Sequence, residues 1–374
     1  MNFQTAVKEF VKTKEPPRTE RYARWCGRSE DKIIIFLLPD LQLPIYKDIV
    51  NCILNRNVIQ YIYWDREVKV MFKNKEGKVR AGWKLVAAFF LYPALTFLIN
   101  ILVGIIIVFI VVFISTFYSV NIDIESLLNV AFIYDKILQN IILILFLVIF
   151  RTKFIKRPMS SMGLTPLKKD YKDFTVGLVF GIVMISVVFG ILLISGNASV
   201  DSWQPRFSSG LLLWLLIFIS VGFAEEMLTR GYIMSLLRQT KSLPMVVIIS
   251  SAIFALLHST NPGVGVLPII NIFLVGTLFA YMYIKSGNIW MPIGYHITWN
   301  YFMGNVYGFK VSGQDTASLI STYLGSNAII SGGDFGPEGG LVVTVITLLG
   351  FIFVKYYYRN SIYDFIKDSK ENLN

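Results

Sequence analysis

Long apolar segments without charge constrain this chain more than any other feature of its sequence. Between Leu85 and Tyr118 there is no Asp, Glu, Lys or Arg. A helix needs about 20 predominantly apolar residues to cross the hydrocarbon core of a bilayer. Hydrophobic residues make up 55% of the 374 residues and charged residues only 16%, and similar segments recur along the chain. The sequence therefore predicts an all-α membrane protein that crosses the bilayer several times.

The apolar segments predict about eight transmembrane helices. Their expected ranges are 85–118, 137–150, 174–195, 210–238, 244–258, 264–284, 289–308 and 341–354. With eight helices, the Lys- and Arg-rich segments 1–84 and 151–173 and the tail from 355 fall on one side of the membrane. Positive charge accumulates in cytoplasmic loops. We therefore expect a multi-pass protein of the cell membrane with both termini in the cytoplasm.

Residues 1–84 form a basic segment before the first apolar run. They hold 17 Lys and Arg against 10 Asp and Glu, which is most of the net charge of +11. Beside a membrane this excess favours contact with anionic lipid, and the segment contains no nucleic-acid-binding motif. Alternation of apolar and polar residues over 68–72, followed by the turn residues 74–77, predicts a small β-hairpin.

A charge cluster interrupts the apolar segment 210–238. Glu225, Glu226 and Arg230 lie where a charged side chain costs a few kcal/mol or more. Glu226 and Arg230 are four residues apart, so they share a helical face and can pair. Glu225 points about 100° away and lacks that partner. The structural alternative is an ion pair that only holds helices together.

The only two histidines of the chain, His258 and His296, also fall in predicted helices. At about 1.5 Å per residue, both lie at a depth similar to that of Glu225, roughly 16–26 Å from the inner ends. Phe254 precedes His258 by one helical turn, and Asn300 follows His296 by one. We expect a polar cavity lined by Glu225, His258, His296 and Asn300. A carboxylate can serve as a general base for water, and imidazole and amide N–H groups can stabilise an oxyanion.

Several other chemistries lack their motifs. The chain has no His-Glu-x-x-His zinc helix, no Asp in any expected span, no Gly-x-Ser-x-Gly nucleophile turn and no phosphate loop. No inverted repeat is visible, which disfavours a transporter. Hydrolysis by an activated water is the chemistry that these residues favour.

The motif residues resemble those of a known family. Glu225-Glu226-x-x-x-Arg230, Phe254-x-x-x-His258 and His296-x-x-x-Asn300 are similar to the three motifs of the CPBP family, also called Abi or type II CAAX prenyl protease-like. The resemblance covers roughly residues 170–358. The loop 332–340 and the segment 299–301 also resemble bacterial members. The resemblance implies that 171–358 is the catalytic membrane core. The apolar and charged segments themselves predict two transmembrane helices and a basic loop in 85–170 and a cytoplasmic tail over 359–374.

The resemblance implies an intramembrane endopeptidase of the glutamate type. Glu225 with His258 would activate water, and His296 with Asn300 would stabilise the oxyanion. Glu226, Arg230 and Phe254 would support the site. A zinc ion held by Glu225, His258 and His296 is an alternative; otherwise no cofactor is expected.

The family's substrates are membrane-embedded or lipidated peptides and proteins. Eukaryotic relatives cut after prenylated cysteines, and bacterial relatives are linked to bacteriocin immunity, peptide maturation and regulated proteolysis. The sequence does not select among these. The alternative function is a non-catalytic immunity or scaffold protein that uses the same fold to bind a partner.

Overall fold

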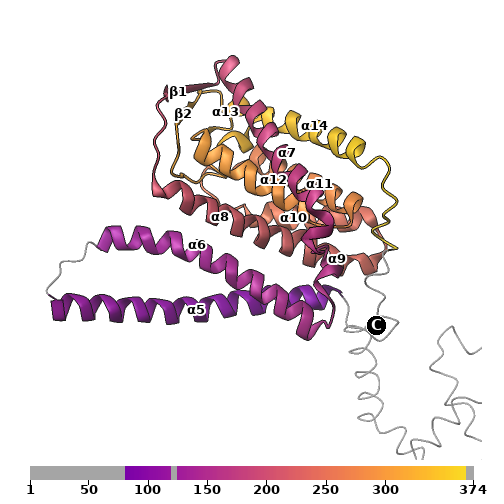
Figure 1. Ribbon diagram of the computed structural model, residues 1–374, viewed down its shortest axis with the longest axis horizontal. Helices are drawn as coiled ribbons and strands as arrows, with labels where there is room; N and C mark the ends of the chain where they lie inside the picture. Colours follow the sequence, from indigo (N-terminus) through magenta and orange to yellow (C-terminus); the bar gives the residue numbers. More distant parts are fainter. Residues whose placement is uncertain (1–80, 119–123, 368–374) are drawn as a thin grey trace, which may run out of the picture. The chain divides into compact units, whose positions relative to one another are not determined.

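A computed structural model of the protein describes residues 81–118 and 124–367 (Figure 1). The predicted β-hairpin at 68–79 and the rest of the basic segment before residue 81 lie outside these residues. The α-helices, in chain order, are α5 (Ala81–Tyr118), α6 (Ile124–Ile149), α7 (Leu167–Ile194), α8 (Ser209–Glu226), α9 (Ser235–Leu237), α10 (Leu243–Leu257), α11 (Val266–Ser286), α12 (Trp290–Tyr301), α13 (Ala328–Ser331) and α14 (Leu341–Tyr357).

Shorter elements connect or extend these helices. Three segments are π-helical: η2 (Phe150–Phe154), η4 (Met227–Met234) and η6 (Phe302–Val306). Four are 3₁₀-helical: η3 (Met159–Met162), η5 (Arg238–Thr240), η7 (Gly333–Phe335) and η8 (Pro337–Gly339). Strands β1 (Ala198–Ser202) and β2 (Ser321–Leu324) pair antiparallel, with Ala198 opposite Leu324. This small ribbon joins the loop after α7 to the loop after α12.

Five helical segments in the described part of the chain are long and apolar enough to cross a membrane. They are Gly82–Phe117, Tyr134–Phe154, Met159–Ile194, Ser209–Thr240 and Val266–Ser286. Helices α10 and α14 are apolar but shorter. At about 1.5 Å per residue, the 15 residues of α10 rise only about 22 Å, less than the hydrocarbon core of about 30 Å. The structure supports a multi-pass, all-α protein, and it does not confirm a count of eight full spans.

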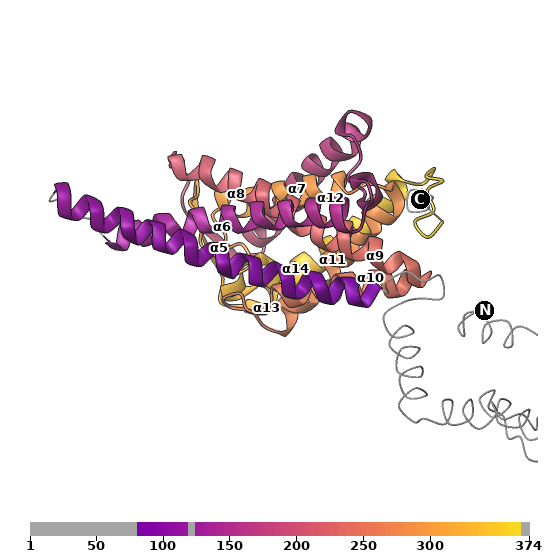
Figure 2. The same cartoon turned by 90° about the horizontal axis from the view of Figure 1, so that it is seen from below.

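Several helices begin or end away from their expected boundaries. Helix α6 begins at Ile124 rather than near 137, and α7 begins at Leu167, inside the basic segment that was expected to be a loop. Asp170 has non-helical backbone angles (φ −115°, ψ 22°) and marks a kink in α7. Lys168 and Lys169 therefore lie on a short helical turn before the apolar part of α7 begins. Helices α5 and α6 lie side by side in both views (Figures 1 and 2).

Helix α12 is almost entirely buried. Every residue from Trp290 to Asn300 is buried, and α12 contacts α7, α8 and α11 (Figure 1). Small residues permit the close approach of α7. A Cβ atom on Gly177 would lie 2.3 Å from the carbonyl oxygen of Met291, and one on Gly181 would lie 2.5 Å from that of Tyr295. The Gly177–Gly181 spacing is thus a helix-packing contact, and it fixes the helix that contains His296 and Asn300.

Candidate active site

Glu226 and Arg230 form a buried ion pair on the segment where α8 continues into η4. Nη1 of Arg230 lies 2.9 Å from Oε1 of Glu226, and both side chains are fully buried. Arg230 also donates to Thr229 Oγ1 at 2.7 Å and to the carbonyl oxygen of Gly276 on α11 at 2.9 Å. Its guanidinium lies 4.3 Å from the ring centre of Phe254. The pairing expected from helical phase is confirmed, and Arg230 links α8, α10 and α11.

The carboxylate of Glu226 also forms a hydrogen bond with His296. Nδ1 of His296 lies 3.1 Å from Oε1 of Glu226. Because that carboxylate oxygen also accepts a hydrogen bond from Arg230, it acts as an acceptor toward the ring, and Nδ1 is the donor. The ring packs against Phe279 and Phe254, with centroid distances of 5.6 and 6.1 Å. His296 is thereby fixed with Nε2 directed away from Glu226.

His258 lies at the end of α10 rather than inside it. The helix ends at Leu257, and His258 is its C-terminal cap. Nδ1 of the ring lies 2.8 Å from the carbonyl oxygen of Phe254. A carbonyl oxygen can only accept a hydrogen bond, so Nδ1 bears the proton. Phe254 thus supports His258 through its backbone as well as by ring contact at 4.8 Å between centroids.

Glu225 lies between the two imidazoles. Its Oε2 is 3.8 Å from Nε2 of His258 and 3.9 Å from Nε2 of His296. Among the described residues this oxygen has no hydrogen-bond partner, although it is itself buried. Both distances exceed a direct hydrogen bond but lie within reach of a single bridging water. The structure therefore brings together the three ionisable groups that the sequence placed on three separate helices.

The charges of this cluster balance when one imidazole is protonated. Two carboxylates, Glu225 and Glu226, face one guanidinium, Arg230. A net charge in a membrane interior is costly, so protonation of one ring would neutralise the group. Since Nδ1 of each ring is already a donor, the added proton would be at Nε2, beside Glu225.

The donor set has the composition of a two-histidine, one-carboxylate metal site, but its spacing differs from one. Tetrahedral zinc, with bonds of about 2.0–2.2 Å, holds its ligand atoms roughly 3.3 Å apart. Oε2 of Glu225 lies 3.8 and 3.9 Å from the two imidazole nitrogens. No group of three His, Cys, Asp or Glu side chains within 81–118 and 124–367 meets the spacing for a metal ion. As placed, these residues do not fit zinc.

Asn300 lies one helical turn beyond His296 and is 6% exposed. Its side-chain amide makes no hydrogen bond to another described residue, in contrast to the amides of Asn271 and Asn305. An amide that is buried on the His296 face of α12 without a protein partner is available to a ligand. The oxyanion role of Asn300 stays a prediction.

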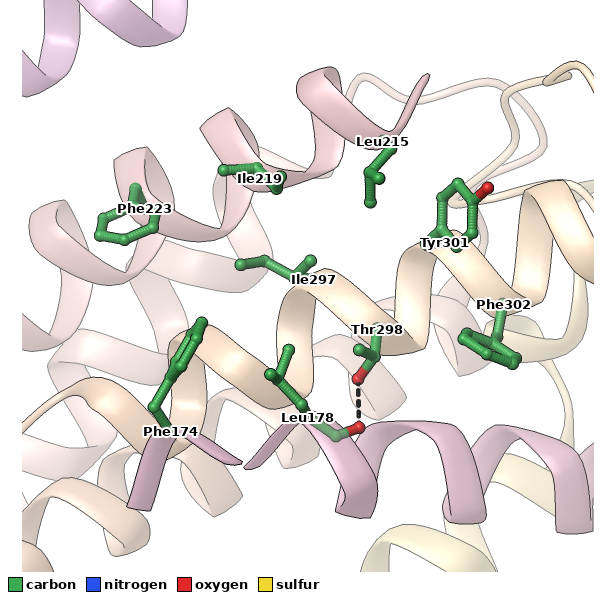
Figure 3. A pocket seen from close by; sticks show the side chains of 9 residues that line it. All are labelled: Phe174, Leu178, Leu215, Ile219, Phe223, Ile297, Thr298, Tyr301 and Phe302. Carbon is green, nitrogen blue, oxygen red and sulfur yellow. Dashed lines mark hydrogen bonds between the residues drawn. The ribbon is translucent and has the colours of Figure 1, made fainter. Parts of the chain in front are cut away.

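An apolar groove lies on a different face of α12 (Figure 3). It has a volume of about 360 Å³ and is lined by Phe174, Leu178, Leu215, Ile219, Phe223, Ile297, Thr298, Tyr301 and Phe302. The hydroxyl of Thr298 is bonded to the carbonyl oxygen of Leu178 at 2.8 Å. Ile297 and Tyr301 each follow a site residue by one position, which turns them about 100° around the helix. None of the predicted site residues lines this groove.

The helices and the buried charged cluster define a multi-pass, all-α membrane protein with a polar site between its helices. Residues 205–302 match the family model described as Type II CAAX prenyl endopeptidase Rce1-like. The match spans about a quarter of the chain and includes all three motifs. This part of the chain is therefore Rce1-like, and the resemblance stated from the motifs is confirmed. The match supports CAAX-type intramembrane protease activity in general. No curated protein and no solved structure matched the chain.

Sequence reasoning missed two contacts of the site. The first is the bond between Glu226 and His296, because helical phase defines faces within one helix but not distances between helices. The second is Phe279, which packs on both Arg230 and His296. With 29 phenylalanines in the chain, nothing in the sequence distinguishes this one.

Proposed function

We propose that this protein is a glutamate-type intramembrane endopeptidase that hydrolyses a peptide bond in a membrane-embedded or lipidated peptide or protein. The observation that most supports this is the convergence of Glu225 Oε2 with Nε2 of His258 and of His296 at 3.8 and 3.9 Å. The family match over 205–302 supports the same chemistry. In this proposal the basic N-terminal segment binds anionic lipid, and the bilayer delivers the substrate.

The proposed reaction begins with a water held between Glu225 and His258. Glu225 removes a proton from the water as its oxygen attacks the carbonyl carbon of the scissile bond. A tetrahedral intermediate forms, with the negative charge on the former carbonyl oxygen. The proton then passes from Glu225 to the leaving amine as the C–N bond breaks. His258, whose Nδ1 is fixed by the Phe254 carbonyl, presents Nε2 to the same water.

Stabilisation of the oxyanion is assigned to His296 and Asn300. His296 can donate from Nε2 only when the ring is an imidazolium, because Nδ1 already donates to Glu226. The carboxylate of Glu226 stabilises that positive charge. The amide of Asn300 supplies a second, neutral N–H donor. Removing one such donor typically costs about 10²–10³ in kcat.

Substitution of Glu225 tests the proposal. Purified protein in liposomes is mixed with solubilised membrane peptides, and new peptide termini are counted by mass spectrometry. We expect Glu225→Gln and His258→Ala to lower the rate by roughly 10²–10⁴, the usual contribution of a general base. Ser259→Ala, an exposed neighbour of His258 whose hydroxyl is bonded to Leu256 O, is the matched control and should retain activity. Full activity in folded Glu225→Gln would exclude the mechanism.

Chelation tests the zinc alternative. If Glu225 acts without a metal, activity persists after prolonged treatment with a strong chelator, and elemental analysis finds no zinc in stoichiometric amount. Loss of activity on chelation, with recovery on adding zinc, would instead assign Glu225, His258 and His296 as ligands.

The alternative function is a non-catalytic immunity or scaffold protein. In that case Glu225→Gln and His258→Ala would leave the cellular phenotype unchanged. If the protein is an endopeptidase, both variants abolish that phenotype. Reconstituted uptake of a solute would indicate a transporter instead.

A further inference from the structure

Glu338 is a buried carboxylate outside the motif residues. It lies on η8, in the loop that precedes α14, and is 7% exposed. Its Oε1 accepts a hydrogen bond from Nε1 of Trp299 at 3.1 Å. Its Oε2 accepts two from Ser312, from the backbone N–H at 2.9 Å and from the hydroxyl at 2.6 Å. A buried carboxylate destabilises the fold unless its oxygens accept hydrogen bonds. Both oxygens of Glu338 do so.

The backbone around Glu338 is fixed to a membrane helix. Nδ2 of Asn271, on α11, donates to the carbonyl oxygens of Glu338 and Gly340 at 2.8 and 2.9 Å. Oδ1 of Asn271 accepts from the hydroxyl of Thr344, on α14, at 2.6 Å. One fully used amide therefore joins the loop to two helices, and Glu338 has a rigid support.

The residue that donates both hydrogen bonds to Oε2 of Glu338 lies in a strained turn. Ser312, which donates both bonds to Oε2, has a φ of +47°, a conformation that is unfavourable for a residue other than glycine. The next residue, Gly313, has a φ of +83°, and a Cβ there would lie 1.9 Å from the carbonyl oxygen of Pro262. The backbone of the loop after α12 is thus strained at Ser312, and both hydrogen-bond donors of that residue point to Glu338.

Trp299 connects this network to the site helix. Trp299 and Tyr295 are four residues apart on α12, and their rings stack at 5.5 Å with an angle of 16° between the planes. His296 and Asn300 each follow one of these residues by one position. The two pairs therefore define neighbouring faces of α12 about 100° apart. Any rotation of α12 about its axis changes both faces together.

We propose that Glu338 is a positioning residue: through Trp299 it fixes the rotation of α12, so that His296 and Asn300 face Glu225. This inference rests on the proposed function for its catalytic meaning, but its geometry can be tested without a substrate. Glu338 does not touch the reacting atoms. It acts through the single hydrogen bond from the Trp299 indole. The hydrogen bonds from Asn271 to the loop backbone and from Ser312 to Oε2 hold Glu338 in place.

The test uses the fact that the chain has only two histidines. Diethyl pyrocarbonate acylates imidazole nitrogens, and peptide mass spectrometry gives the modification rates of His296 and His258 in one sample. We expect Trp299→Phe, which keeps an aromatic ring but removes the N–H donor, to raise the ratio of the His296 rate to the His258 rate. The expected rise is roughly threefold to tenfold, the equilibrium effect of losing one hydrogen bond. Glu338→Gln should act in the same direction.

Ser331→Ala is the matched control. Ser331 is fully buried in the same loop and donates to the carbonyl oxygens of Gly325 and Asn327, but it has no bond to α12. Its loss should lower the melting temperature without changing the ratio. An unchanged ratio in folded Trp299→Phe would overturn the proposal, as would an equal rise in Ser331→Ala. If Glu338→Gln does not fold, Trp299→Phe decides alone. A wild type without peptidase activity would contradict the proposed function and leave the labelling result unaffected.

Discussion

Glu225 and Glu226 are adjacent in the sequence but have different surroundings. Glu226 is fully buried and bonded to both Arg230 and His296. The Glu225 side chain is 26% exposed, and its Oε2 has no hydrogen-bond partner within the described residues. The rotation of about 100° between successive helical residues explains the difference. Glu226 neutralises charge and orients an imidazole, and Glu225 is the general base of the proposed reaction.

Removing Arg230 should destabilise the fold. Arg230→Met leaves Glu226 buried beside His296 without its guanidinium, and breaking a buried ion pair costs about 3–5 kcal/mol. We expect unfolding in detergent at a clearly lower denaturant concentration than for the wild type.

The double variant Glu226→Met with Arg230→Met is the control for this prediction. It removes both charges, so most of the lost stability should return, while peptidase activity stays low because His296 has lost its acceptor. A double variant as unstable as Arg230→Met alone would show that the charges are not mutually compensating.

At the scale of elements, the site depends on how closely α7 approaches α12. Gly177 and Gly181 on α7 and Gly294 on α12 leave no space for a side chain. A Cβ on Gly294 would lie 2.5 Å from the carbonyl oxygen of Phe174. The hydroxyl of Thr298 then reaches the carbonyl oxygen of Leu178 across the interface. This contact sets the position of α12, and the bond to Glu338 is proposed to set its rotation.

Gly181→Ala should therefore separate α7 from α12. A Cβ there would lie 2.3 Å from Oγ1 of Thr298, and overpacking of this kind costs about 1–3 kcal/mol. Gly190→Ala, on the same helix, is the matched control, since nothing lies within 4 Å of its Cβ position. There we expect a neutral effect or a gain of about 0.5–1 kcal/mol. Equal melting temperatures for the two variants would contradict the close contact.

At the scale of the whole molecule, hydropathy and motif spacing predicted the membrane class, the Glu226–Arg230 pair and the meeting of Glu225 with both histidines. The expected ranges 244–258 and 341–354 already gave α10 and α14 as short helices. They did not predict that α6 begins at Ile124 or α7 at Leu167, because an apolar composition does not determine where a helix begins. They also did not indicate the π-helical turns after Glu226 and Tyr301, which depend on local hydrogen bonds such as that from Thr229 Oγ1 to Glu225 O. The role of Glu338 depends on loop packing, which has no sequence periodicity.

The most direct measurement compares peptides from membranes that contain the wild type or Glu225→Gln after incubation in ¹⁸O-labelled water. If Glu225 activates water for peptide hydrolysis, wild-type membranes yield a set of peptides with ¹⁸O in their new C-terminal carboxylates. That set should be absent from the Glu225→Gln sample, although the variant is present at the same level and melts at the same temperature. The same labelled peptides in both samples would contradict the account.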